Sequence, residues 1–165
     1  MSWDPLVRIT HWLIAALFLA NFWVLEEGDW HEWAGYAVLA LLLVRWLWGF
    51  VGPANARFGD FLPTPARVKR SVREFAAEHD AARHEPRHTP LAGVMVMGLW
   101  LGLGLVGFTG WLQETDRFWG EQWLQQIHYW LANLVMAAVV LHVAAVVVIQ
   151  RKFGLPLVRS MIRGR

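Results

Sequence analysis

The sequence predicts an all-α protein, a transmembrane four-helix bundle in which residues 1–165 form a single membrane domain. Composition is the first reason: the chain is 56% hydrophobic, has a positive mean hydropathy and contains twelve tryptophans, all high for a water-soluble domain. Length is the second, because 165 residues are too few for two domains of ordinary size. The third is a set of four apolar runs, each of about the 20 residues needed to cross the hydrocarbon core. They span residues 6–25, 31–52, 90–112 and 127–149.

Each run is apolar around its whole circumference, which is typical of a helix surrounded by lipid. The first is longer than the apolar core of a signal peptide and is not followed by a clear small-residue cleavage site, so we expect a retained helix. In the third run, Gly98 and Gly102 are four residues apart and predict close packing against a neighbouring helix. Four spans place both termini on the same side of the membrane.

Charge predicts the orientation. The loop at 53–89 and the tail after 149 are basic, whereas the other two connections are acidic and contain Arg117 as their only basic residue. By the positive-inside rule, both termini and the loop 53–89 are cytoplasmic. A basic amphipathic segment at 64–88 predicts a helix on the lipid surface, with a docking site for a partner as the alternative. We expect no nucleic-acid partner.

Histidine is the candidate ligand. The chain has no cysteine, which excludes thiolate ligands and covalent haem attachment, but it has seven histidines. Four of these fall in or at the ends of spans, and an imidazole in lipid is costly unless it faces the bundle interior and has a partner. These four functional candidates are His11, His31, His128 and His142. The other three, His79, His84 and His88, lie in the cytoplasmic loop, where we expect them to be solvated.

The four histidines sort by depth into two pairs. With the orientation above, His11 and His142 lie toward the cytoplasmic face and form an inner pair, while His31 and His128 form an outer pair. His128 and His142 are fourteen residues apart, which corresponds to about 21 Å along a helix and returns to within about 40° of the same face. One helix therefore contributes a ligand to both pairs.

Two opposed imidazoles on neighbouring helices are suited to the iron of haem, since two axial nitrogens saturate the metal for electron transfer. Two pairs predict two haem b groups. The alternatives are interfacial or hydrogen-bonding histidines, or a zinc or copper site, which would require three or four ligands at one depth. Arg8 and Arg45 lie near the inner end of their spans and are candidate partners of haem propionates, with extension to lipid headgroups as the alternative.

The pattern resembles the bacterial di-haem b-type cytochromes, comprising the cytochrome b561 group and the cytochrome b subunit of nickel-iron hydrogenases. The matching stretches are RITHW at 8–12, HEWAG at 31–35, RWLWGFVGPANARFGDF at 45–61 and HYWLANLVMAAVVLH at 128–142. The resemblance covers nearly the whole chain. It implies His11, His31, His128 and His142 as axial ligands, and a multi-pass protein of the bacterial inner membrane.

Three functions remain open on the sequence. The first is an electron carrier between a quinone/quinol pool and a redox partner protein, such as a hydrogenase-like protein or a cytochrome c. The second is a superoxide:quinone oxidoreductase acting on its own, which the acidic outer connections disfavour because an anion must be drawn in. The third is a non-redox scaffold or transporter. The sequence does not decide between an electron-transfer protein and an oxidoreductase subunit.

Overall fold

The computed structural model describes residues 3–53, 56–57, 69 and 90–164. Within these residues the chain is helical and has no strand. The helices are α1 (Pro5–Trp23), α2 (Asp29–Val51), α5 (Pro90–Gln113), α6 (Gln122–Phe153) and α7 (Leu157–Arg163). The all-α prediction is confirmed. The surface helix expected at 64–88 lies, apart from Lys69, outside the described residues.

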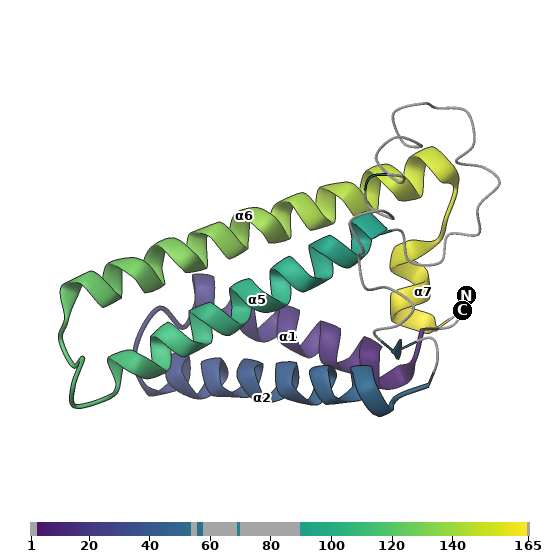
Figure 1. The fold of residues 1–165 in the computed structure, drawn as a ribbon. Helices are drawn as coiled ribbons and strands as arrows, with labels where there is room; N and C mark the ends of the chain where they lie inside the picture. Colours follow the sequence, from purple (N-terminus) through teal and green to yellow (C-terminus); the bar gives the residue numbers. More distant parts are fainter. Residues whose placement is uncertain (1–2, 54–55, 58–68, 70–89, 165) are drawn as a thin grey trace.

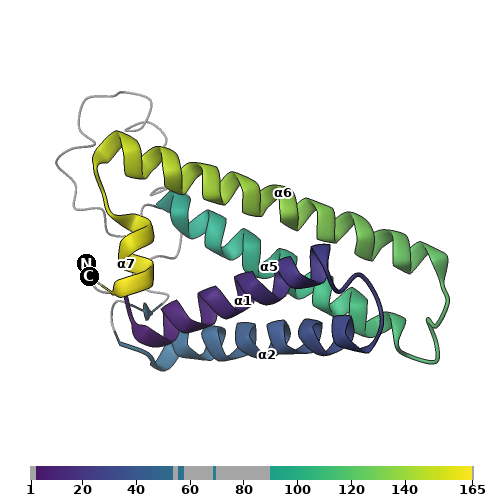
Figure 2. The ribbon, with the colours of Figure 1, turned by 180° about the vertical axis from the view of Figure 1, so that it is seen from behind.

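Helices α1, α2, α5 and α6 are long and apolar enough to cross a membrane. They lie side by side in an elongated bundle, and both chain ends are found at the same end of it (Figures 1 and 2). In backbone packing, α1 lies against α2, α2 against α5 and α5 against α6. The main packing partner of α6 is thus α5, and α6 approaches the α1–α2 pair less closely. The four-helix transmembrane bundle is confirmed.

Helix α6 is longer than expected: it begins at Gln122 and ends at Phe153, whereas the sequence predicts a span at 127–149. Its 32 residues measure about 48 Å at 1.5 Å per residue, more than the hydrocarbon core requires. The additional turns are polar at both ends and therefore give no hydropathy signal. Gly154 ends the helix in the left-handed region, at φ 65°, which glycine adopts without steric cost.

Helix α7 was not predicted, because seven residues give too short a pattern to recognise. It turns back beside the N-terminal end of α1 (Figure 1). Arg8 donates from Nε to the carbonyl oxygen of Met161 at 3.2 Å and from Nη2 to that of Ile162. Trp12 Nε1 also donates to the Met161 carbonyl, at 3.3 Å. These side chains of α1 satisfy carbonyl groups that the end of α7 leaves without helical partners.

The start of α1 is fixed by Asp4. Its carboxylate accepts hydrogen bonds from the backbone N–H groups of Leu6 and Val7, at 3.0 and 3.2 Å, and Pro5 occupies the first helical position. The same carboxylate oxygen accepts from Trp48 Nε1 of α2 at 3.1 Å. One side chain therefore caps α1 and joins it to α2 at the inner end of the bundle.

The apolar core lies midway along the bundle, where Phe18, Val38, Leu103 and Val135 are buried together. Val135 is seven residues from both His128 and His142. Likewise, Phe18 follows His11 by seven residues, and Val38 follows His31 by seven. Seven residues are about two helical turns and return to nearly the same face. The core layer therefore separates an inner and an outer level of histidines.

Glycines in α5 allow its neighbours to come close. A Cβ atom at Gly102 would lie 2.7 Å from Cγ2 of Val135 on α6, and one at Gly107 would lie 2.5 Å from Cδ2 of Leu39 on α2. A larger residue at either position would force its neighbour to shift, so glycine permits both close contacts. The predicted close packing is confirmed at Gly102. At Gly98, none of the described residues has an atom within 4 Å of such a position.

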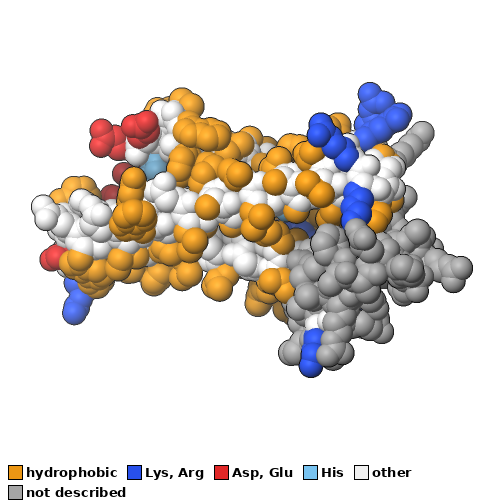
Figure 3. All heavy atoms as spheres, turned by 90° about the horizontal axis from the view of Figure 1, so that it is seen from above, with side chains coloured by type: hydrophobic (Ala, Val, Ile, Leu, Met, Phe, Trp, Pro, Cys, Tyr) orange, Lys and Arg blue, Asp and Glu red, His pale blue; other side chains and the backbone are white. Residues whose placement is uncertain are grey.

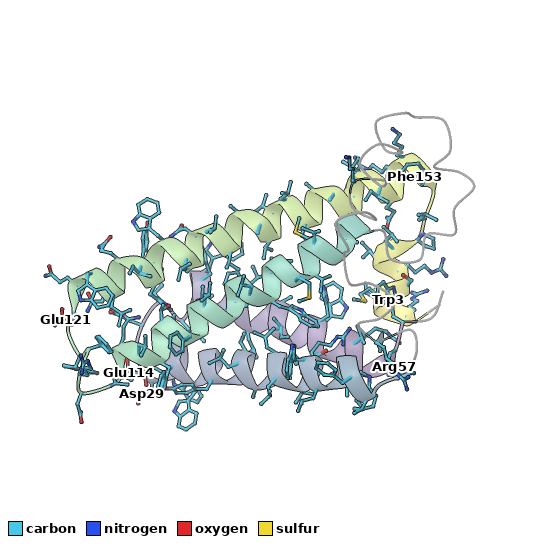
Figure 4. The ribbon with its side chains drawn as sticks, viewed as in Figure 1. Trp3, Asp29, Arg57, Glu114, Glu121 and Phe153 are labelled. Atoms are coloured by element: carbon cyan, nitrogen blue, oxygen red, sulfur yellow. The ribbon has the colours of Figure 1, made fainter. Side chains whose placement is uncertain are left out.

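Charged side chains mark the two ends. Asp29, Glu114 and Glu121 lie at one end, and Arg57 lies at the end that also contains Trp3 and Phe153 (Figure 4). In the space-filling view, hydrophobic side chains cover the surface between a mainly acidic and a mainly basic end (Figure 3). By the positive-inside rule, we expect the basic end with both termini to face the cytoplasm.

Candidate functional site

The outer histidines come together in the folded chain. His31 in the first turn of α2 and His128 in the second turn of α6 have ring centroids 6.1 Å apart and an interplanar angle of 69°. Both side chains are partly buried. The two residues lie at the same depth because each is near the start of its helix and both helices run from the outer end of the bundle toward the inner end.

The inner histidines also come together. His11 of α1 and His142 of α6 have ring centroids 6.4 Å apart and an interplanar angle of 55°. The single helix α6 therefore carries one member of each pair, as the fourteen-residue spacing predicts. About 21 Å of helix axis separates the two levels, with the apolar layer around Val135 between them.

Both separations fit a metal ion held between two imidazoles. Bonds from a metal to an imidazole nitrogen are about 2 Å long, and adding the two ring radii places the centroids about 6.4 Å apart. Ordinary contact between aromatic rings covers the same range, so distance alone does not decide the chemistry. The hydrogen bonds of the imidazoles are more informative.

In the outer pair, each Nδ1 atom already has a partner. His31 Nδ1 lies 2.6 Å from the carbonyl oxygen of Leu25, which can only accept, so this nitrogen carries the proton. His128 Nδ1 lies 3.1 Å from the hydroxyl oxygen of Thr109. A neutral imidazole protonated at Nδ1 has its free lone pair at Nε2, the form that a metal-binding histidine adopts.

In the inner pair, Nδ1 of His11 is buried and has no hydrogen-bond partner among the described residues. A buried polar atom without a partner costs about 1–3 kcal/mol in a folded protein. The two ring separations and the two outer Nδ1 contacts fit the binding of haem iron through Nε2.

The described residues do not support a zinc or copper site. No group of three or more His, Cys, Asp or Glu side chains among them could hold a metal ion. The histidines occur two to a level, whereas a protein zinc site has three or four protein ligands.

The profile of the prokaryotic cytochrome b561 family matches residues 2–164. The chain belongs to the prokaryotic cytochrome b561 family. No curated protein and no solved structure shows significant similarity to it. Family membership establishes a multi-pass b-type cytochrome of the bacterial inner membrane that binds haem b and transfers electrons. The resemblance noted in the sequence is thereby confirmed.

Arg45 of this cytochrome is buried, with 8% of its surface exposed. Its Nη1 atom donates to the carbonyl oxygen of Ala56 at 3.4 Å, and its guanidinium lies 5.2 Å from the ring centroid of Trp100. Arg45 follows His31 by fourteen residues, as His142 follows His128, and both helices run the same way. The cation therefore lies at the depth of the inner histidine pair, inside the bundle instead of among headgroups.

Arg8 lies in α1, three residues before His11, and its hydrogen bonds run to the end of α7. These contacts give it a structural role. An interaction of Arg8 with a haem propionate stays a prediction.

Sequence reasoning missed two polar side chains next to the outer pair. Thr109 of α5 contacts His128, and Asn21 of α1 donates from Nδ2 to the carbonyl oxygen of His31 at 3.0 Å. Threonine and asparagine within apolar helices were the available signal, because a polar side chain in lipid needs a partner. Only the fold reveals that in both cases the partner is a histidine of the outer pair.

Proposed function

We propose that this cytochrome holds two haem b groups, one between His11 and His142 and one between His31 and His128, and carries electrons between them across the membrane. The observation that supports this most directly is the presence of two separate histidine pairs on one continuous helix, with nearly equal ring separations. When bound, haem supplies one-electron chemistry by cycling between ferric and ferrous iron.

The residues of the chain would set three conditions for this chemistry. A pair of imidazoles would hold the iron of each haem, and iron held by two protein nitrogens would favour electron transfer over oxygen binding. The buried layer of Phe18 and Val135 excludes water between the two levels. Helix α6 fixes the distance between the levels, because both His128 and His142 belong to it.

We assign Arg45 as a propionate partner of the inner haem. Its guanidinium is buried at the depth of His11 and His142, and a buried cation requires compensation by opposite charge or hydrogen bonds. Among the described residues, Asp4 supplies an opposite charge that acts on this guanidinium. The contacts that these residues make, to Ala56 and Trp100, engage only part of the five-donor fork, and a carboxylate can accept from the rest.

We further propose that the electrons are exchanged between a quinone/quinol pool and a redox partner protein. A quinone dissolves in the bilayer and would reach a haem along the apolar surface that the helices present to lipid. At the outer end, Glu26, Glu27 and Asp29 form an exposed acidic connection, which complements a partner with a basic surface.

Haem stoichiometry in single histidine variants tests the pairing. The wild-type protein should contain two reducible haem b groups per chain. His11→Ala and His142→Ala should lack the same spectral component, and His31→Ala and His128→Ala should lack the other. His84→Ala, a change in the loop, is the control and should retain both. A wild-type redox spectrum with one b-type component would overturn the two-haem proposal.

Quinol oxidation tests the electron path. In proteoliposomes under anaerobic conditions, a quinol should reduce the haems of the wild-type protein. His11→Ala and His128→Ala should each block transfer from the quinol to an acceptor on the opposite side. Equal transfer rates in the wild-type protein and both variants would contradict the proposed path.

A further inference from the structure

Thr109 is a buried residue of α5, with 7% of its surface exposed. Its hydroxyl oxygen lies 2.9 Å from the carbonyl oxygen of Leu105 and 3.0 Å from that of Val106. It also lies 3.1 Å from Nδ1 of His128 on the neighbouring helix. One side chain thus connects the backbone of α5 to an imidazole of α6.

The direction of this hydrogen bond follows from the chemistry of its neighbours. A threonine hydroxyl has one proton to donate and two lone pairs that accept. The two carbonyl oxygens can only accept, so the hydroxyl proton is directed to the backbone of α5. A lone pair then faces His128, and Nδ1–H of the imidazole donates to Thr109. This arrangement leaves Nε2 of His128 as the free nitrogen.

The next residue of α5 shapes the same contact. A Cβ atom at Gly110 would lie 3.3 Å from Cε1 and 3.7 Å from Nδ1 of His128, so the imidazole lies against bare backbone. Thr109 therefore offers an acceptor to the ring Nδ1–H, beside the backbone of Val106, and Gly110 leaves the space that the ring occupies. Helix α5, which contributes no histidine, controls the orientation of one that belongs to α6.

We infer that Thr109 is a positioning residue for His128 that lowers the midpoint potential of the outer haem. This inference rests on the proposed function, since it takes His128 as an axial ligand. A ligand histidine that donates from its second nitrogen is a stronger base toward the metal. A stronger base stabilises ferric over ferrous iron, and hydrogen bonding around the ligands tunes haem potentials. In the inner pair, Nδ1 of His11 has no such acceptor among the described residues.

The chain offers a matched control in Thr10 of α1. Thr10 is buried, with 4% of its surface exposed, and its hydroxyl also bonds the carbonyl oxygens three and four residues earlier, those of Val7 and Leu6. Among the described histidines, none has a hydrogen bond with this hydroxyl. Thr10→Val and Thr109→Val therefore remove the same internal hydrogen bonds from a helix, but only the second also removes an acceptor from His128.

The test is a potentiometric titration of the haem-loaded protein, followed by absorbance, with electron paramagnetic resonance of the ferric state. Thr109→Val should shift one of the two haem transitions to a more positive potential, alter the resonance of that haem only, and weaken its retention roughly tenfold. Thr109→Ser, which restores the hydroxyl, should return the wild-type potential. Thr10→Val should leave both transitions unchanged.

Two results would overturn the inference: wild-type potentials in Thr109→Val, or the same shift in Thr10→Val and Thr109→Val. Selective loss of one haem in Thr109→Val, with both retained in Thr109→Ser and Thr10→Val, would support it. The two-haem proposal is tested separately. It requires two haems in the wild-type protein and the loss of one of them in His128→Ala. If those two results hold and Thr109→Val is unchanged, only the positioning role is wrong.

Discussion

Gly110 of α5 lies directly behind the imidazole of His128 on α6, so that a Cβ atom added at position 110 would lie 3.3 Å from Cε1 of the ring. This contact is tighter than nine in ten contacts made by real Cβ atoms, and the ring would have to move by a few tenths of an ångström. The close approach of the ring to the backbone, and not the presence of a glycine as such, indicates a steric requirement at position 110.

We expect Gly110→Ala to displace His128 and perturb the outer site while the fold is retained. A displacement of a few tenths of an ångström at the ring edge should rotate the imidazole of His128. This rotation should change the electron paramagnetic resonance spectrum of one ferric haem. The control is Gly104→Ala, since a Cβ atom there would have no atom within 4 Å. Electron paramagnetic resonance spectra of both variants test this prediction. A wild-type spectrum in Gly110→Ala would show that the ring has room to adjust.

The core layer gives a second prediction. Phe18 is buried between the two histidine levels, and Phe18→Ala should lower the free energy of unfolding by about 3–5 kcal/mol because it leaves a cavity. Thermal denaturation in detergent measures this. Leu43→Ala is the control, because Leu43 is 57% exposed on the helix surface and its loss should cost less. Equal losses in the two variants would contradict the assignment of the core.

How much of this site could be predicted from the sequence depends on the kind of residue. Histidines are rare in apolar spans, and the depth of each follows from the direction of its helix, so the pairs His11 with His142 and His31 with His128 could be proposed in advance. Their proximity is confirmed by ring separations of 6.4 and 6.1 Å. Their role as ligands stays a prediction.

Residues that act through contacts across the bundle could not be predicted in this way. Thr109 appears in the sequence as one small polar residue among glycines, and its partner is nineteen residues away on another helix. The rotation of α5 about its axis determines whether it faces His128 or lipid. No hydrophobic period defines that rotation, because α5 is apolar on all sides.

The outer end gives a prediction about pH. Glu114 is exposed, but slight desolvation and the nearby carboxylate of Glu32 raise its pKa above the ordinary range. Since the folded protein then binds a proton more readily than the unfolded chain, lowering the pH through the interval between the raised and the ordinary pKa should increase stability. In Glu114→Gln this increase should be absent.

Denaturation temperatures of the wild-type protein and Glu114→Gln, measured from about pH 7 down to about pH 4, test this prediction. The difference in denaturation temperature between the two proteins should be largest at the upper end of this pH range, where Glu114 is ionised. Glu32→Gln should reduce the pH dependence, because it removes the neighbouring negative charge. A wild-type profile parallel to that of Glu114→Gln would refute a raised pKa at this position.

At the inner end, Arg8 should determine whether α7 stays docked. Its guanidinium donates to the carbonyl oxygens of Met161 and Ile162, and hydrogen bonds to charged groups contribute about 1.5–3 kcal/mol each. Arg8→Ala should therefore increase the population with α7 detached by at least about tenfold. Trypsin cleaves after arginine, and Arg159 lies within α7, so the cleavage rate there should rise in proportion to the detached population.

The matched control for this experiment is Arg117→Ala, at the opposite end of the bundle, where the guanidinium lies 5.7 Å from the ring centroid of Phe118. It removes the same side chain without affecting α7, so cleavage after Arg159 should match the wild-type rate. Trp12→Phe, which removes one donor to Met161, should give an intermediate rate. If Arg8→Ala is cleaved no faster than Arg117→Ala, α7 is held by its apolar contacts and not by its carbonyl groups.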